Sequence, residues 1–150
     1  MLQPIDVKIR LLRPCADVPR YATPGSAACD LTAAVPEAVT VPAHGSLSIP
    51  TGIAIEMEEP GTVAIVCARS GLAFKHAISL VNGIGVIDFD YRGEICVGLR
   101  NDSDEDYVVA PHERIAQLMF LPYRSAAFTT SDTLGETERG TGGFGSSGRM

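Results

Sequence analysis

Short apolar runs, each closed by a proline or a glycine, constrain this chain more than any other feature of its sequence. Its 150 residues include 15 glycines and 10 prolines. Most of the runs alternate apolar and polar residues, and only residues 70–76 predict a helix, of one or two turns. Many short strands with closely spaced turn signals predict an all-β sandwich or barrel. We expect strands near residues 5–12, 28–34, 39–41, 47–49, 53–57, 62–68, 77–81, 84–87, 95–99, 107–110 and 115–122.

Composition limits the partners of this fold. A chain of this length suits one domain with a single core. The net charge of −6 argues against general nucleic-acid or membrane-surface binding, but a local arginine cluster could still hold one small anion. No apolar run reaches transmembrane length, and the first residues lack a signal-peptide layout. The four cysteines form no CxxC pair, so we expect reduced thiols and a cytoplasmic location.

Residues 82–101, NGIGVIDFDYRGEICVGLRN, are the most informative stretch. An apolar run at 84–87 meets a polar segment that ends at Gly93, and alternation resumes over 95–99. Two such runs around a short polar segment predict a β-hairpin. The carboxylate of Asp88 falls between the turns, where burial is costly unless the group is paired or used. Asp88 is therefore either a turn cap or a functional carboxylate.

Two further segments carry groups that can bind an anion. Arg69, Ser70 and Gly71 stand where a strand ends and the expected helix begins. Backbone N–H groups at a helix start attract anions, and arginine binds phosphate oxygens through two donors. The alternative is that Ser70 is an ordinary N-cap. Gln117 lies in the last apolar strand, where it is either a satisfied core amide or a ligand-binding group.

The last segment, residues 125–150, is rich in serine, threonine and glycine and has no periodicity. Residues 140–145 match G-x-G-x-x-G, but the strand and helix that flank a dinucleotide fingerprint are missing. Glycines nevertheless let backbone N–H groups surround an anion, and Ser146 adds a donor. The alternative is a disordered end. Arg139 and Phe144 among the glycines argue against a simple linker.

Taken together, the chain resembles the trimeric dUTP pyrophosphatases (dUTPases) in five segments, which stand in the order and spacing of the family's five motifs. These segments are residues 25–31, 68–71, 85–93, 114–117 and 139–148. The departures are small and fall on no residue that carries chemistry in the family: Ala68 replaces a proline, Cys29 a larger residue and Ala77 a frequent glycine.

The resemblance implies a jelly-roll-like β fold and a homotrimer with three active sites, each built from three chains. Residues 1–124 would form the catalytic β-barrel. Residues 125–150 would form an arm that closes over the active site of a neighbouring subunit.

The resemblance also implies hydrolysis of dUTP to dUMP and pyrophosphate, which limits uracil incorporation into DNA and supplies dUMP for dTMP synthesis. Asp88 would orient and deprotonate the water that attacks the α-phosphorus. Mg²⁺ would be held by the three phosphates, and Asp30 would contact it through water.

The implied substrate contacts form two sets. The phosphates would be held by Arg69, Ser70, Gly71, Gln117, Arg139, Gly145 and Ser146. The base and sugar would be held by Asn82, Gly83, Val86, Ile87, Tyr91, Cys96 and Phe144, with Tyr91 under the deoxyribose and Phe144 stacked on the uracil.

Alternatives remain open. A dCTP deaminase, or a bifunctional deaminase–dUTPase, shares the fold but carries a second serine after Arg-Ser and lacks this glycine-rich arm. A non-enzymatic, nucleotide-sensing module would be expected to lack Asp88 or the arm, and this chain has both. A structural β protein with a disordered tail would leave five ordered motifs to chance.

Overall fold

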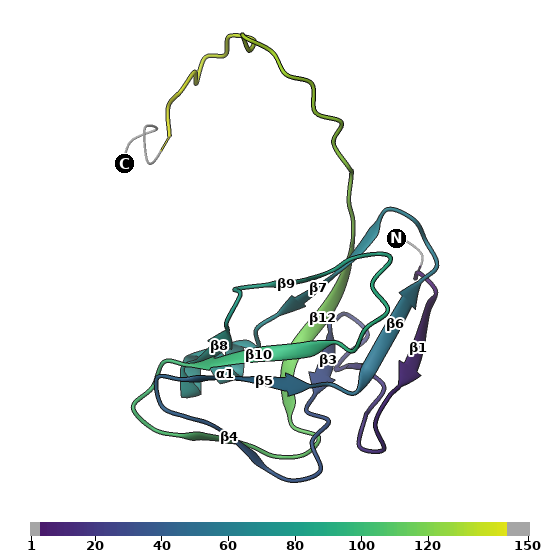
Figure 1. Ribbon diagram of the computed structural model, residues 1–150, viewed down its shortest axis with the longest axis vertical. Coiled ribbons are helices and arrows are strands. Elements are labelled where there is room, and N and C mark those ends of the chain that lie inside the picture. The colour runs from purple at the N-terminus through teal and green to yellow at the C-terminus, as the bar shows by residue number, and fades with distance from the viewer. Residues whose placement is uncertain (1–3, 144–150) are drawn as a thin grey trace.

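The computed structural model describes residues 4–143, and antiparallel sheets around one core dominate them (Figure 1). A five-stranded sheet has the order β2 (Arg20–Tyr21), β3 (Cys29–Thr32), β12 (Arg114–Pro122), β7 (Thr62–Cys67) and β9 (Gly85–Ile87). A three-stranded sheet has the order β5 (Ser46–Pro50), β10 (Cys96–Asn101) and β8 (Ile78–Leu80). Two further pairs join β1 (Val7–Leu11) to β6 (Ile53–Met57) and β4 (Val39–Val41) to β11 (Tyr107–Val109). With one short helix, α1 (Ser70–His76), this confirms the predicted jelly-roll-like all-β class.

The core follows from period-2 alternation. In β10, Val97 and Leu99 are each 1% exposed, whereas Cys96 before them and Arg100 after them are exposed. Burial of each large aliphatic side chain stabilises the fold by about 1.5–3 kcal/mol. The largest fully buried side chains are Leu31, Ile49, Ile53, Met57, Ile78, Ile95, Leu99, Ile115, Leu118, Val41, Val97 and Val109.

The predicted hairpin within residues 82–101 is wrong. β9 pairs with β7, with Val86 opposite Ile65, whereas β10 pairs with β5 and β8. Figure 1 shows the two strands in different sheets, joined by the loop that contains Asp88. Alternation identified both strands correctly. It reports which face of a strand is buried but carries no information about the strand's partner.

Helix α1 has the predicted bounds, residues 70–76, and its two ends have distinct backbone conformations. The N-cap is Arg69, with φ −90° and ψ 127°, and it makes no side-chain capping bond. Ser70 is therefore the first helical residue, and the alternative that Ser70 is the N-cap is wrong. At the other end Ala77 takes the left-handed conformation, with φ 54°, and its N–H donates to the carbonyl of Ala73 at 3.1 Å.

Beyond β12 the chain leaves the β body. Residues 123–143 contain no strand or helix, and Figure 1 shows them extending well away from the sheets. The two-residue β2 was missed, because prolines on both sides made residues 13–27 look irregular throughout. Within residues 4–143 we find no helix with the length and apolar character needed to cross a membrane.

Candidate active site

One cluster of charged side chains is centred on Asp30 in β3, which is only 8% exposed. One carboxylate oxygen accepts a hydrogen bond from Arg69 Nε at 3.1 Å, and the other accepts one from Arg114 Nη1 at 3.1 Å. Arg69 Nη1 also donates to the backbone carbonyl of Arg114 at 3.0 Å. Two guanidinium groups against one carboxylate leave an excess positive charge, which suits a phosphorylated ligand.

Sheet register explains why these residues meet. Strand β12 lies between β3 and β7, and Gln117 pairs with Asp30 on one side and with Cys67 on the other. Arg69 follows Cys67 by two residues, so the side chain of Arg69 reaches the cluster from the end of β7. Gln117 is half-buried in this row. The register therefore places it beside the two arginines, rather than in the apolar core.

Ser70 and Gly71 continue this surface into the first turn of α1, where both are exposed. A Cβ atom built on Gly71 would meet no other atom within 4 Å. Nothing within the described chain therefore requires a glycine at this position. The open backbone beside Arg69 remains accessible to a ligand.

A second group of predicted residues surrounds the turn after β8. The N–H of Gly83 donates to the carbonyl of Leu80 at 3.2 Å, and the N–H of Ile84 donates to that of Asn82 at 2.8 Å. Val86 in β9 is 57% exposed, which leaves an apolar surface beside these backbone groups. Polar backbone next to an apolar wall is the arrangement that recognises a flat heterocycle.

The loop after β9 carries the predicted catalytic carboxylate. Asp88 is exposed, and its backbone carbonyl accepts the N–H of Tyr91 at 3.1 Å. The hydroxyl of Tyr91 donates to the carbonyl of Glu94 at 3.0 Å. A Cβ atom at Gly93 would lie 2.6 Å from Cζ of Tyr91, so any other residue would displace the ring. Glycine at this position lets the tyrosine fold back over the loop.

The structure does not bring this loop to the Asp30 cluster within one chain. Ile87 pairs with Ala64, and β7 runs onward from there toward Arg69. At about 3.3 Å per residue, Asp88 and Arg69 lie roughly 15–20 Å apart along the sheet. Cys96 belongs with the loop region: it is exposed at the start of β10, and partial burial raises the pKa of its thiol.

Of the predicted arm residues, only Arg139 belongs to the described part of the chain. Arg139 donates through Nε to the carbonyl of Gly142 at 2.9 Å, and the N–H of Gly140 donates to the carbonyl of Thr137 at 3.0 Å. Arg139 therefore sits on a local turn of the exposed segment that leaves the body in Figure 1. The predicted ligands Phe144, Gly145 and Ser146 lie outside the described residues.

The donor set suits a magnesium ion that a substrate carries. Among residues 4–143, no group of three or more histidine, cysteine or acidic side chains is arranged to hold a metal. Each oxygen of Asp30 accepts one arginine N–H, which leaves lone pairs for a water molecule. Mg²⁺ commonly binds one or two carboxylates together with substrate phosphates and retains several waters. Contact through water is therefore compatible with Asp30.

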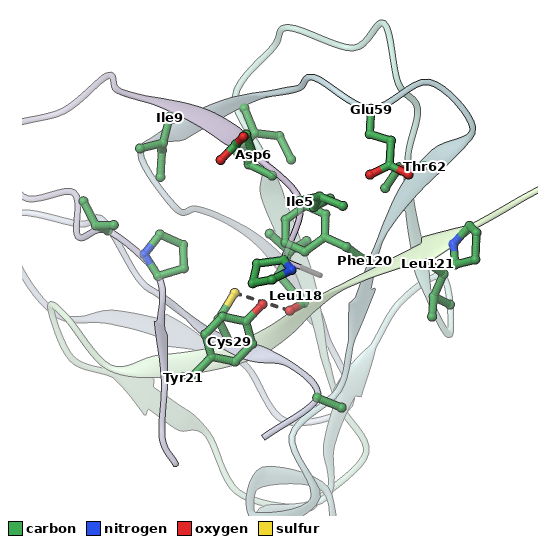
Figure 2. A pocket seen from close by; sticks show the side chains of 17 residues that line it. Ile5, Asp6, Ile9, Tyr21, Cys29, Glu59, Thr62, Leu118, Phe120 and Leu121 are labelled. Carbon is green, nitrogen blue, oxygen red and sulfur yellow. Dashed lines mark hydrogen bonds between the residues drawn. The ribbon is translucent and has the colours of Figure 1, made fainter. Parts of the chain in front are cut away.

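An apolar cavity of about 770 Å³ lies elsewhere in the body (Figure 2). Ile5 and Ile9 line one side, and Phe120 and Leu118 of β12 line another. Cys29 Sγ donates to the carbonyl of Leu118 at 3.3 Å inside it. No predicted site residue contributes to its wall, so this cavity is separate from the candidate site despite its size.

Sequence reasoning missed three residues that organise the site. Arg114 lay inside a recognised segment but was assigned no role, and strand register alone would have placed it near Asp30. Arg13 and Glu94 form a two-bond ion pair at 2.6 and 2.8 Å across 81 positions of sequence. No local pattern identifies such a pair. The one sequence signal for a role of Glu94 was its position directly after Gly93, the last residue of the segment that carries Asp88.

Fold and site define an all-β protein with an arginine–carboxylate cluster suited to a phosphorylated ligand and a separate loop that carries an exposed carboxylate. The chain belongs to the dUTPase family, whose model matches residues 15–148.

Similar proteins agree with this assignment. A deoxyuridine 5'-triphosphate nucleotidohydrolase of Desulfitobacterium hafniense is 49% identical over 146 residues, which cover 96% of this chain and 97% of the relative. Among solved structures, the dUTPase of Staphylococcus bacteriophage 80alpha with dUPNHPP superposes with a TM-score of 0.87 at 25% identity, covering 96% of this chain and 99% of that one.

A mutant dUTPase from phage phi11 of S. aureus superposes with a TM-score of 0.77 at 20% identity, covering 85% of this chain and 97% of that one. That structure is described as revealing the coordination of a structural Mg(II) ion. At this identity the likeness supports the fold of the present chain.

Proposed function

We propose that this protein is a dUTP diphosphatase, which hydrolyses dUTP to dUMP and pyrophosphate. The observation that carries the proposal is the family match over residues 15–148, with a nucleotidohydrolase relative at 49% identity. The reaction would limit uracil incorporation into DNA and supply dUMP for dTMP synthesis. No observation favours deamination of dCTP or a purely nucleotide-sensing role.

Asp88 is the proposed general base. Its exposed carboxylate would orient a water molecule and accept its proton as the water oxygen attacks the α-phosphorus, with pyrophosphate as the leaving group. A positioned base contributes about 10²–10⁴-fold to the rate. A bound Mg²⁺ supplies neutralisation of the negative charge on the phosphates. Support for the assignment of Asp88 comes from its place in the loop: its backbone carbonyl accepts the N–H of Tyr91, and among the described residues its carboxylate has no hydrogen-bond or ion-pair partner.

The Asp30 cluster is the proposed phosphate site. Arg69 would bind phosphate oxygens together with Ser70, Gly71 and the amide of Gln117. The ion pair with Asp30 fixes the guanidinium before the ligand arrives, so less conformational entropy is lost on binding. Arg139, Gly145 and Ser146 would complete the phosphate contacts from the arm.

The turn after β8 is the proposed site of the base. Backbone groups near Asn82 and Gly83 would pair with the uracil edge, and Val86, Ile87 and Cys96 would line the slot. Cytosine reverses the donor and the acceptor at this edge, and such a mismatch in a site built for hydrogen bonding costs factors of about 10⁴–10⁵. Tyr91 would pack under the deoxyribose, and Phe144 would cover the uracil.

We propose that the active site is shared between chains of a homotrimer. The separation of Asp88 from Arg69 within one chain supports this, because a single nucleotide must contact both regions. Residues 1–124 would form the catalytic body. Residues 125–150 would close over the site of a neighbour, and the described part of this segment, residues 125–143, extends away from the body (Figure 1).

We also propose that the protein works in the cytoplasm. All four cysteines, Cys15, Cys29, Cys67 and Cys96, are free thiols. Free thiols suit a reducing compartment.

The test is release of pyrophosphate with Mg²⁺ from dUTP, dCTP, dTTP and UTP in parallel, with Asp88→Asn as the control. We expect release from dUTP alone and its loss in the variant. Ammonia release from dCTP would indicate a deaminase instead. Binding of dUTP without release of pyrophosphate would indicate a sensing module.

A further inference from the structure

The loop that carries Asp88 is fastened to a distant part of the chain through Glu94. One carboxylate oxygen of Glu94 accepts Arg13 Nε at 2.6 Å and the N–H of Gly52 at 3.0 Å. The other accepts Arg13 Nη2 at 2.8 Å. The Glu94 side chain is 21% exposed, so solvent screens this two-bond pair less than it screens a pair on the open surface.

Ile95, which follows Glu94, anchors the end of the loop in the hydrophobic core. Ile95 is 1% exposed, and its N–H donates to the carbonyl of Ile53 at 2.9 Å. Its carbonyl accepts the N–H of Thr51 at 3.1 Å and the hydroxyl of the same residue at 2.6 Å. The loop that begins after β9 thus ends at two consecutive residues, Glu94 and Ile95, whose hydrogen bonds hold them to other parts of the chain.

Glu94 is in direct contact with the loop's functional side chain. The Glu94 carbonyl accepts the hydroxyl of Tyr91 at 3.0 Å, and the Tyr91 N–H donates to the carbonyl of Asp88 at 3.1 Å. The guanidinium of Arg92 closes the same loop on the carbonyl of Phe89 at 2.8 Å. Hydrogen bonds, together with the covalent structure of Glu94 and Tyr91, therefore link Arg13 to the backbone of Asp88.

We propose that Arg13 and Glu94 are positioning residues, whose ion pair fixes the position and orientation of the Asp88 loop relative to the sheets. The inference rests on the proposed function for its kinetic consequence, while the fastening of the loop is a property of the fold. Arg13 donates its side-chain hydrogen bonds to Glu94, and its charge also acts on the nearby thiol of Cys96. A shift of about 1 Å in a catalytic group costs up to about 10²-fold in rate, so a loosened loop lowers kcat.

The experiment compares Arg13→Ala, Glu94→Gln and the double variant with the full-length protein. We expect kcat for dUTP to fall about tenfold or more in each single variant. The kcat of the double variant should be no lower than that of the less active single variant, because both substitutions break the same pair. Arg13→Lys should be intermediate, because it retains the charge and loses the two-bond geometry.

Two controls separate positioning from general stability. Arg100→Ala removes another exposed arginine–carboxylate pair, with Asp102 at 2.8 Å, and should leave kcat unchanged. Millimolar guanidinium should restore turnover to Arg13→Ala and not to Glu94→Gln, because only the first variant keeps the carboxylate that receives it.

Hydrogen–deuterium exchange of residues 84–95 gives a readout independent of turnover. We expect faster exchange there in Arg13→Ala and Glu94→Gln than in wild type or Arg100→Ala. Unchanged loop exchange, or wild-type kcat and KM in both single variants, would overturn the inference. A wild-type protein that leaves dUTP intact would refute the proposed function, and the exchange experiment would still decide whether the pair fastens the loop.

Discussion

The Asp30 cluster and the Asp88 loop are built in opposite ways. Asp30 is nearly buried in β3, the second strand of the five-stranded sheet, and its two arginine partners reach it from β12 and from the end of β7. Asp88 is exposed on a loop between two sheets, and its backbone makes the contacts that hold it. The ion pairs of the first region form within one chain. The second region exposes Asp88 to solvent.

With the roles proposed above, the difference separates phosphate binding from catalysis. A cluster assembled by strand register is rigid before the ligand arrives, which suits phosphate binding. A base on an exposed loop gains its environment only when substrate and a second surface meet it. The two regions should therefore respond differently to substitution.

The largest expected effect is the loss of the base. Asp88→Asn removes the proton acceptor and retains the shape of the side chain, so we expect kcat to fall about 10²–10⁴-fold. Binding of a non-hydrolysable dUTP analogue, measured by calorimetry, should stay near the wild-type value. Substantial turnover in the variant would place the base elsewhere, and Asp90 would be the next residue to test.

Mixed trimers test whether the two regions belong to different chains of one site. Asp88→Asn and Arg69→Ala should each be nearly inactive alone. If the chains assort at random and each site takes these residues from two chains, co-expression restores about a quarter of the sites. The measurement is the specific activity of the whole purified pool of co-expressed trimers. Activity no higher than that of the two parents would mean that one chain supplies both residues.

Strands were predictable from sequence, and their partners were not. The alternation over residues 53–57 matches β6, and residues 39–41 match β4. The same reasoning joined residues 84–87 to 95–99 as a hairpin, yet these runs enter different sheets. Alternation depends on the side chains of one strand, whereas pairing depends on the packing of the whole chain.

The site shows the same limit. Arg69 and Asp88 were identified through the family resemblance, because their segments are short and characteristic. The contact between Arg69 and Asp30 joins residues 39 positions apart, and the pair of Arg13 and Glu94 spans 81 positions. Such pairs exist only once the sheets are assembled. Nothing within a short window of sequence distinguishes them from surface charges.

Asp30→Asn tests whether Asp30 organises the two arginines of the cluster for phosphate binding. An amide can accept one arginine and must point its NH₂ group at the other, so the two guanidinium groups lose their shared anion. Breaking a buried ion pair costs about 3–5 kcal/mol, and partial exposure of both arginines reduces this to about 2 kcal/mol here. Urea denaturation should show this loss together with a raised KM. A normal KM with normal stability would mean that the cluster does not organise phosphate binding.

Ala77→Gly should stabilise the helix beside the cluster without touching the chemistry. Ala77 ends α1 with φ 54°, a conformation in which a Cβ atom costs about 1–2 kcal/mol. Glycine removes this strain and loses about 0.4–1 kcal/mol through the unfolded state, so we expect a net gain of about 0.5–1 kcal/mol. Thermal unfolding gives the measurement. Ala73→Gly, in the helix interior, is the matched control and should destabilise by about 1 kcal/mol.

The smallest expected effect is a selective loosening of the Asp88 loop in acid. Hydrogen bonds from Arg13, the arginine's charge and the N–H of Gly52 hold the pKa of Glu94 below its ordinary value of 4.5. A carboxyl whose pKa is lower in the folded than in the unfolded state stabilises the fold above the unfolded value. That contribution is lost as the pH falls through the folded value, so protection of residues 84–95 from hydrogen exchange should decline below about pH 4.5.

Glu94→Gln decides whether this carboxyl is the cause. The variant carries no titrating group at the position, so its loop should exchange faster at neutral pH and show little further change on acidification. Asp17 also has a lowered pKa, mainly because His112 donates to it, and its acid response should persist in the variant. Acid that loosened residues 84–95 equally in both proteins would show that the loop is fastened by something other than Glu94. The contrast between a rigid phosphate cluster and a separately fastened loop would then need a different physical basis.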